Sequence, residues 1–144
     1  DKGRNETSQE LITRTPSALI SEEEINIFLN KWLQAQNDKL YEEYSGCYSN
    51  QFQGVRRTKS GGVYYFDYSD WLHDRIKMYT SAKNLNISIG NVQRLDNDFN
   101  GTTIKFIQKY SSDAYQDIGE KIMKLVKKGN GELRIVYEEM LNSN

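Results

Sequence analysis

The chain has 144 residues and a formal net charge of −1, with 19 Lys or Arg residues against 20 Asp or Glu residues. This length suits one domain that buries a core without disulfides, and the single Cys could not supply a disulfide framework. The charges are interspersed, so no basic surface for nucleic acid or anionic lipid is expected. No apolar run is long enough to span a bilayer, and a membrane link is expected only through an upstream anchor.

Residues 1–20 are polar and contain the only proline, Pro16. A segment of this composition cannot bury enough apolar surface to order itself. We therefore expect residues 1–20 to be a flexible linker or trimmed N-terminal segment, and residues 21–144 to form the domain. Such a linker would tether the domain to a lipid anchor or to another domain.

Two helices are expected in the first third of the domain. Ser21 and Glu24 have capping-box spacing, in which each side chain accepts a hydrogen bond from the other residue's backbone amide. An apolar stripe at helical spacing follows, made of Ile25, Phe28, Leu29, Trp32 and Leu33. Asp38 then interrupts the pattern and is predicted to cap a shorter helix that carries Leu40, Tyr41, Tyr44 and Tyr48.

A basic, glycine-rich stretch between residues 51 and 68 predicts a small β-hairpin or an ordered loop. Its tip would contain Arg56, Arg57, Lys59, Gly61 and Gly62. These cations could bind an anionic ligand, but the interpretation we prefer is a solvated loop tip.

A third helix is expected after Asp67 or Ser69, either of which could cap it. One face of this helix would present Trp71, Leu72, Arg75, Ile76 and Tyr79. An arginine on an apolar face needs a partner, because an unpaired buried charge costs several kcal/mol.

The remaining sequence predicts four long antiparallel strands. Leu85, Ile87 and Ile89 alternate, and the phase slips at Gly90–Asn91, which predicts a bulge. Residues 96–101 form a turn, and the next strand places Ile104, Phe106, Gln108 and Tyr110 on one face. A final pair turns at residues 129–131 and returns through Leu133, Ile135 and Tyr137. Helices before a strongly bent sheet indicate an α+β fold, with three N-terminal helices closing the concave face.

Several kinds of catalytic site are disfavoured by the residues available. Cys47 and the only histidine, His73, could form a nucleophilic pair, but a buried Cys and a solvated His are the preferred interpretation. One Cys and one His cannot make a tetrahedral metal site, and no phosphate-binding glycine loop is present, so no metal or cofactor is expected. General acid–base work stays open through Asp113, Asp117, Glu138 and Glu139, although Lys121 and Glu138 are expected to form a cross-strand ion pair.

The order of these segments resembles the nuclear-transport-factor-2-like superfamily, which includes ketosteroid isomerases and SnoaL-like proteins and has a cone-shaped α+β fold. More closely, residues 24–140 resemble the accessory domain attached to bacterial periplasmic L,D-transpeptidase-related cell-wall proteins. The matching positions are Trp32, Ala35, Tyr44, Phe52, Trp71, Arg75, Phe106, Gln108, Tyr110, Ser112, Tyr115, Asp117, Lys121 and Glu138. The chain departs from the family pattern at Leu133, where a Trp is usual, and it lacks the Ser-His-Gly-Cys motif of the transpeptidase itself.

The resemblance implies a non-catalytic module of a secreted or periplasmic bacterial protein, which binds a ligand or partner such as glycan or peptidoglycan-derived material. Its pocket is expected between the third helix and the concave sheet, lined by Tyr44, Trp71, Arg75, Gln108, Tyr110 and Tyr115. One alternative is a small SnoaL-like or ketosteroid-isomerase-like enzyme with an acid–base residue inside the cone. Another is a dimerisation or docking domain that self-associates through the convex sheet face, formed by Lys105, Ile107, Lys109, Lys124 and Val126.

Overall fold

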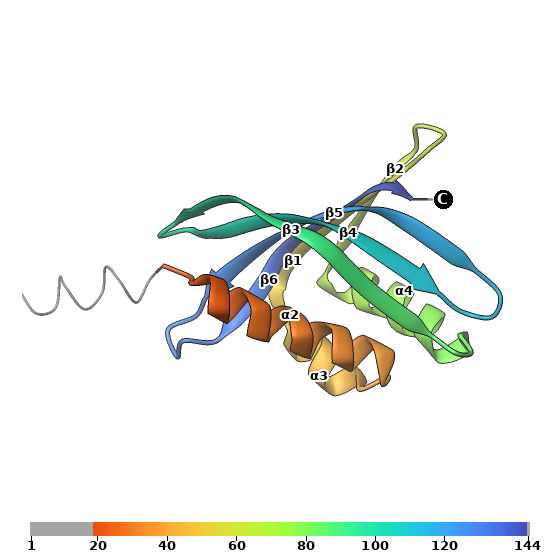
Figure 1. The fold of residues 1–144 in the computed structure, drawn as a ribbon, viewed down its shortest axis with the longest axis horizontal. Helices are drawn as coiled ribbons and strands as arrows, with labels where there is room; N and C mark the ends of the chain where they lie inside the picture. Colours follow the sequence, from red (N-terminus) through yellow and green to blue (C-terminus); the bar gives the residue numbers. More distant parts are fainter. Residues whose placement is uncertain (1–18, 144) are drawn as a thin grey trace, which may run out of the picture.

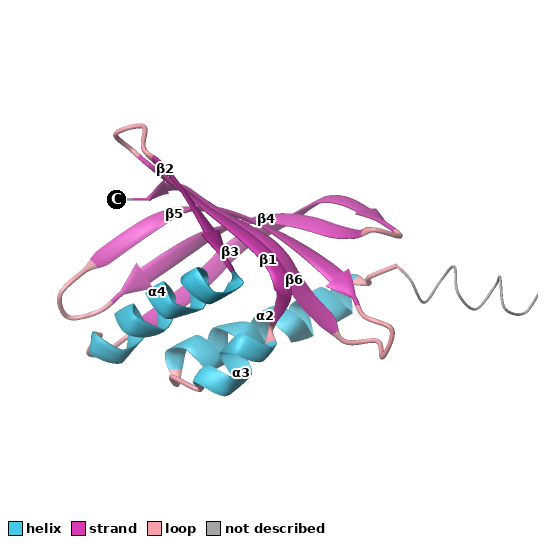
Figure 2. Ribbon diagram, turned by 180° about the vertical axis from the view of Figure 1, so that it is seen from behind, coloured by secondary structure: helices cyan, strands magenta, loops and turns pink. Residues whose placement is uncertain are grey.

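The computed structural model describes residues 19–143, which form three helices and one six-stranded sheet (Figure 1). In chain order the elements are α2 (Glu22–Asn37), α3 (Tyr41–Gly46), β1 (Tyr48–Thr58), β2 (Val63–Asp67), α4 (Tyr68–Ser81), β3 (Asn86–Asp98), β4 (Gly101–Ser111), β5 (Gln116–Lys127) and β6 (Leu133–Ser143). All three helices lie on one face of a strongly curved sheet (Figure 2). This arrangement confirms the predicted α+β class.

The sheet has the strand order β2-β1-β6-β5-β4-β3. The prediction of a wholly antiparallel sheet is wrong at one pair, because β1 and β6 run parallel, with Gly54 opposite Glu138. The reason is topological: the β3–β6 meander ends beside β1, and α4 lies in the connection between these two parts of the sheet. A two-residue alternation of side chains is the same in parallel and antiparallel strands, so it could not reveal this pairing.

Helix caps explain where α2 and α4 begin. At α2 the Ser21 hydroxyl accepts from the Glu24 amide at 3.1 Å and the Glu24 carboxylate accepts from the Ser21 amide at 3.0 Å, which confirms the capping box. Asp67 caps α4 by accepting from the Asp70 amide at 2.8 Å.

The second helix differs from its prediction. Asp38 is the C-cap of α2, and Leu40, without a side-chain bond, precedes α3. Lys39 takes a positive φ of 57° and turns the chain between the two helices. Tyr48 does not belong to the helix, since it begins β1.

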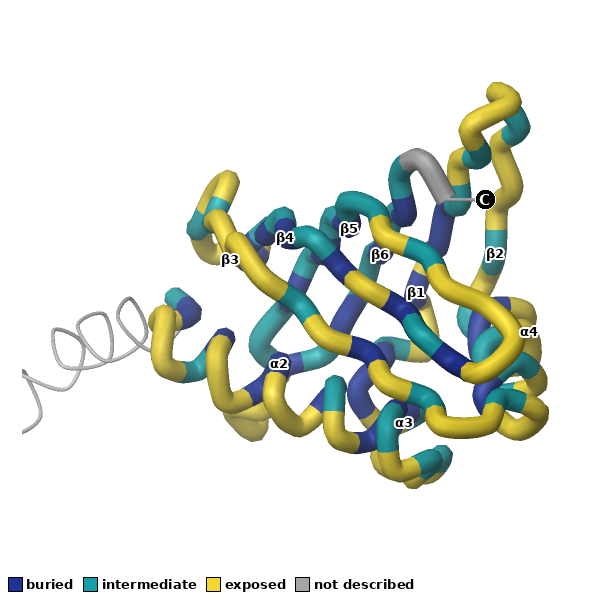
Figure 3. The backbone as a smooth tube through the Cα atoms, turned by 45° about the vertical axis from the view of Figure 1, so that its right-hand side comes forward, coloured by how far each residue is buried: buried dark blue, intermediate teal, exposed yellow. Residues whose placement is uncertain are grey.

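The predicted inward face of β4 is confirmed. Ile104, Phe106, Gln108 and Tyr110 are buried and alternate with more exposed residues along the strand (Figure 3). The predicted bulge in β3 is also present, since the register shifts between Gly90 and Gln93 and Asn91 has a φ of 56°.

Two strand-end predictions need correction. The predicted turn at residues 96–101 is shorter, because Asp96–Asp98 belongs to β3 and only Phe99 and Asn100 separate it from β4. In β6 the register slips between Leu125–Ile135 and Lys124–Tyr137. This irregularity puts Glu138 and Met140 on the buried face, so Tyr137 does not continue the face of Leu133 and Ile135.

The core lies between the helices and the concave side of the sheet, and its largest fully buried side chains include Trp32, Trp71, Tyr44, Phe52 and Phe106. Ile20, at the end of the predicted linker, is buried in this core, while residues 1–18 lie outside the described part. Within residues 19–143 no helix combines the length and apolarity needed to cross a membrane.

Candidate functional site

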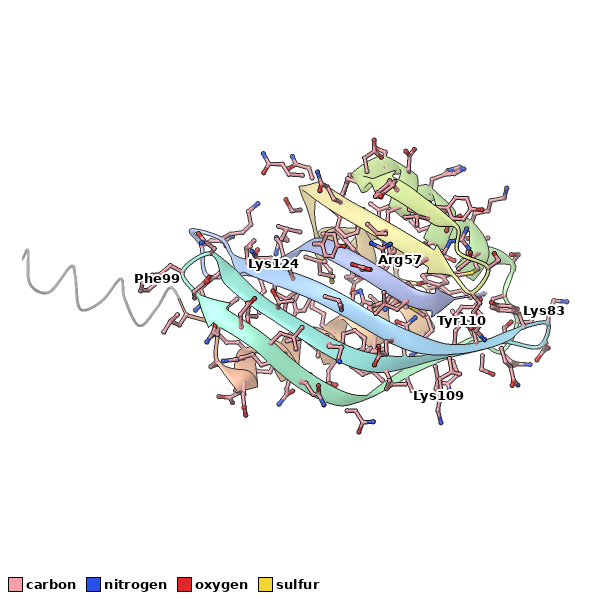
Figure 4. The ribbon with its side chains drawn as sticks, turned by 90° about the horizontal axis from the view of Figure 1, so that it is seen from above. Arg57, Lys83, Phe99, Lys109, Tyr110 and Lys124 are labelled. Atoms are coloured by element: carbon pink, nitrogen blue, oxygen red, sulfur yellow. The ribbon has the colours of Figure 1, made fainter. Side chains whose placement is uncertain are left out.

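A cavity of about 440 Å³ opens between α4 and the concave side of the sheet. Figure 4 shows Tyr110, which lines it, toward the end of the sheet where Lys83 lies and away from Phe99 at the opposite end. The volume is within the usual range for sites that hold small molecules. The lining residues are Arg56, Asp74, Arg75, Met78, Ser81, Ala82, Gln108, Tyr110, Ser112, Ala114, Tyr115, Asp117 and Met140.

Arg75 reaches the cavity from α4. It follows Trp71 by four residues, so the two side chains share one side of the helix, and the guanidinium carbon lies 4.7 Å from the Trp71 ring centroid. Its Nη2 forms an ion pair with Asp74 Oδ2 at 3.2 Å, but Asp74 is itself exposed. Arg75 Nε is buried and has no hydrogen-bond partner among the described residues. The charge of Arg75 is therefore only partly neutralised within this part of the chain.

Arg56 reaches the same cavity from β1. It lies opposite Tyr64 of β2, and its guanidinium carbon is 5.1 Å from the Tyr64 ring centroid. Its Nε is buried, and the described residues offer it no hydrogen-bond partner. The predicted hairpin is confirmed, but Arg56 belongs to a strand and to the cavity rather than to a solvated tip.

Arg57, the next residue along β1, points to the other face of the sheet. Its Nε lies 2.5 Å from Glu139 Oε2, and half of the Arg57 side chain is exposed. Neighbouring arginines on a strand thus have opposite environments, because successive side chains alternate between the two faces.

The polar wall of the cavity comes from β4 and the loop that follows it. Gln108 lies opposite Gly119 in the register of β4 and β5, so no side chain covers it from that position. Its buried Oε1 has no hydrogen-bond partner in the described part. Tyr110 faces Asp117, and the rings of Tyr110 and Tyr115 are 5.8 Å apart in a tilted arrangement. Burial raises the pKa of Tyr110 and of Tyr115, so both hydroxyls stay protonated and can donate hydrogen bonds at neutral pH.

Four of the six predicted pocket residues line this one cavity: Arg75, Gln108, Tyr110 and Tyr115. The other two do not reach it. Tyr44 is buried with its hydroxyl 3.2 Å from that of Tyr48, and Trp71 is completely buried beneath Arg75. Arg56 was missed as a pocket residue, although the alternation of Phe52, Gly54 and Arg56 already put it on the side of a large apolar residue.

A buried polar network lies behind the cavity, in the core. As predicted, Lys121 and Glu138 form an ion pair, with 2.5 Å between Lys121 Nζ and Glu138 Oε2. The Tyr48 hydroxyl donates to Glu138 Oε1 at 2.5 Å and accepts from Trp32 Nε1 at 3.1 Å. Burial lowers the pKa of Lys121, and the attraction of Glu138 opposes this shift. Neither charged residue lines the cavity, so the pair has its partners inside the fold.

Cys47 and His73 do not form a catalytic pair. His73 is exposed on α4, whereas Cys47 is buried at the end of α3 with its thiol directed at the Glu43 carbonyl, 3.4 Å away. In the described residues no group of His, Cys, Asp and Glu side chains could hold a metal ion.

Burial raises the pKa of the Cys47 thiol to about 11, and we expect this to make it unreactive in the native protein. At pH 8 only about a thousandth of the thiol would be thiolate. Iodoacetamide labelling followed by mass spectrometry should be slow in buffer and fast in urea. Native labelling within about tenfold of the unfolded rate would contradict the burial of this group.

Solved structures share the fold at low sequence identity. Bd1075 from Bdellovibrio bacteriovorus matches with a TM-score of 0.67 and 20% identity over 82% of this chain, which corresponds to 39% of that chain. An NTF2-like protein of unknown function from Pseudomonas aeruginosa matches with a TM-score of 0.66 and 15% identity, covering 85% of this chain and 96% of that one. The beta subunit of benzoate 1,2-dioxygenase from Burkholderia mallei matches with a TM-score of 0.66 and 18% identity, covering 87% of this chain and 91% of that one. No curated protein sequence matches.

These likenesses agree with the architecture described above, in which helices pack on the concave side of a curved sheet. A sequence model described as the Cds6 C-terminal NTF2-like domain matches residues 24–139. The matched range begins inside α2 and ends inside β6, so it contains almost every described element. The chain therefore belongs to the family of Cds6 C-terminal NTF2-like domains.

Proposed function

We propose that this domain is a non-catalytic binding module that holds a small ligand by an acidic group. The observation that supports this most strongly is the convergence of Arg56 from β1 and Arg75 from α4 on one cavity. Each has a buried Nε without a hydrogen-bond partner among the described residues.

The energetic reason is that a partly buried guanidinium is poorly solvated and gains from an anionic partner. A planar carboxylate matches the fork of N–H donors on arginine, and such charge-assisted hydrogen bonds are stronger than neutral ones. Arg56 lies over the Tyr64 ring, and Arg75 lies over the Trp71 ring. These contacts hold both cations in place before a ligand arrives. Tyr110 and Tyr115 add apolar contact area and hydroxyl donors.

The acid–base enzyme has less support. It needs an ionisable group that is both inside the cone and available to a substrate. The inward carboxylate of Glu138 is completely buried, already paired with Lys121 and Tyr48, and absent from the cavity lining. Asp117 does line the cavity, so the enzyme stays an alternative that would have to use this carboxylate.

The resemblance of residues 24–140 to domains of periplasmic L,D-transpeptidase-related proteins extends the proposal to a bacterial cell-envelope setting and to cell-wall fragments as ligands. The match to only part of Bd1075 supports the idea of a module that works within a longer protein. Self-association through the convex face also stays a prediction. Of its five positions, Lys109 is exposed and the other four are partly buried. On the same face, Lys105 Nζ lies 3.9 Å from Glu120 Oε2.

The test is calorimetric titration of the chain with N-acetylmuramic acid, compared with N-acetylglucosamine, which lacks the lactyl carboxylate. We expect only the acid to bind, and R56Q to weaken that binding by about 10- to 100-fold, because a charged hydrogen bond contributes roughly 1.5–3 kcal/mol. R57Q is the matched control, since it removes the same group one residue away on the opposite face.

Equal binding of the two sugars, or equal losses in R56Q and R57Q, would contradict an acid-binding role for the cavity. Melting curves of both variants should show that each remains folded at the temperature of the titration.

A further inference from the structure

The charges around the cavity are balanced rather than uniformly positive. Arg56 and Arg75 are accompanied by Asp74 and Asp117, and no lysine is among the lining residues. A site for a multivalent anion would be expected to carry an excess of cations, because each carboxylate near the anion opposes its binding. The balance instead suits a ligand that has both charges.

The two signs are also separated in space. Asp74 is held by Arg75, but Asp117 forms no ion pair with any described residue. Asp117 belongs to β5 and Arg56 to β1, with β6 between them, so their strands are about 10 Å apart at roughly 4.8 Å per spacing. In the strand register, Arg56 of β1 and Lys121 of β5 both lie opposite Met140 of β6. Asp117 lies four residues before Lys121 on β5, so it is also displaced from Arg56 along the strand direction. The cavity therefore has a cationic side and an anionic side.

Two further groups in the lining agree with this polarity. The buried acceptor Gln108 Oε1 has no partner in the described part and could accept from an N–H or O–H of the ligand. Charges of both signs act on Tyr115. Burial has the largest effect on its pKa and raises it, the Asp117 carboxylate raises it further, and the Arg56 and Arg75 cations lower it. Its hydroxyl thus lies within electrostatic reach of both sides of the cavity.

We propose that the ligand is dipolar, an amino acid or short peptide that has a free carboxylate and a free ammonium group. The carboxylate binds between Arg56 and Arg75, and the ammonium binds at Asp117. This inference rests on the proposed function of the cavity and adds the second charge. The offset of four residues adds about 13 Å along the strands to the roughly 10 Å across them, so the Cα atoms of Arg56 and Asp117 are about 16 Å apart. A peptide of about three residues, which spans roughly 3.3–3.6 Å per residue when extended, has the right reach if the Arg56 and Asp117 side chains extend toward it.

The experiment titrates the chain with trialanine, N-acetyl-trialanine and trialanine amide, each blocked form lacking one of the two charges. We expect trialanine to bind at least about tenfold more tightly than either blocked form, as loss of one charge-assisted hydrogen bond predicts. D117N should weaken the binding of trialanine by about tenfold and leave the affinity for N-acetyl-trialanine unchanged. R56Q should weaken the binding of both trialanine and N-acetyl-trialanine.

The matched control is D113N, which removes an acidic charge from the same loop region at a residue that is bonded to Asn84 and does not line the cavity. Equal affinities for trialanine and N-acetyl-trialanine, or a D117N effect that is the same for both, would overturn the dipolar ligand. Arg56-dependent binding of N-acetylmuramic acid would then still uphold the proposed function. If trialanine fails to bind at millimolar concentration while that acid binds, the dipolar inference is wrong. If neither binds, both proposals are wrong.

Discussion

Lys121→Met should lower the free energy of unfolding by about 3–5 kcal/mol, the usual effect of removing one member of a buried ion pair. Glu138 is completely buried, and among the described residues the variant would leave its carboxylate with only the Tyr48 hydroxyl as a hydrogen-bonding partner. Methionine has a similar length and is apolar, so the loss would come from the uncompensated charge rather than from a cavity. Urea denaturation followed by circular dichroism would measure it.

The double variant K121M/E138Q should recover most of this stability. It removes both charges, and the new amide oxygen can still accept from the Tyr48 hydroxyl. K124M is the control for removing a lysine from β5, because Lys124 is on the other side of the strand and partly exposed, and we expect a change within about 0.5 kcal/mol. A loss in K121M as small as that in K124M would show that the ion pair is not needed to hold the core together.

The parts of the fold that could be predicted are those in which a local pattern determines the structure. Alternation along Ile104, Phe106, Gln108 and Tyr110 identified the buried face of β4, because successive side chains of a strand point in opposite directions. The Ser21 cap was equally local, since it depends on residues three apart. The same local rule predicted Gln108 and Tyr110 as inward polar groups.

The parts that could not be predicted depend on pairings between distant segments. Tyr44 has an inward position on its helix, but Tyr48 and Tyr79 enclose it at ring distances of 5.2 and 5.7 Å, so it does not reach the cavity. The role of Arg56 depends on the β1–β2 register, which places Tyr64 beside it, and on the parallel docking of β6. A sequence shows the face of a strand, whereas the neighbours on that face come from the topology.

Trp71→Ala should be the most damaging single change near the site, with a loss of about 3–5 kcal/mol in the free energy of unfolding. Trp71 is fully buried, its ring centroid lies 5.3 Å from that of Phe52 and 5.4 Å from that of Phe66, and a Cβ on Gly54 would approach it to 2.5 Å. This close packing means that the hole could not be filled easily by its neighbours. The melting temperature should fall by about 10 °C or more.

The same change should weaken binding of N-acetylmuramic acid, because Arg75 rests on the Trp71 ring and would lose its fixed position. W71F should retain most of the binding, since a ring remains under the guanidinium, and the indole N–H that it removes has no partner in the described part. W32F is the control, because it also replaces a buried indole with a phenyl ring, at a position away from Arg75. It removes the hydrogen bond to Tyr48, so it should lower the free energy of unfolding and leave the affinity for N-acetylmuramic acid unchanged. If W71A and W32F reduced affinity equally in folded protein, the effect would be one of general stability, and the ring under Arg75 would have no specific part in holding the ligand.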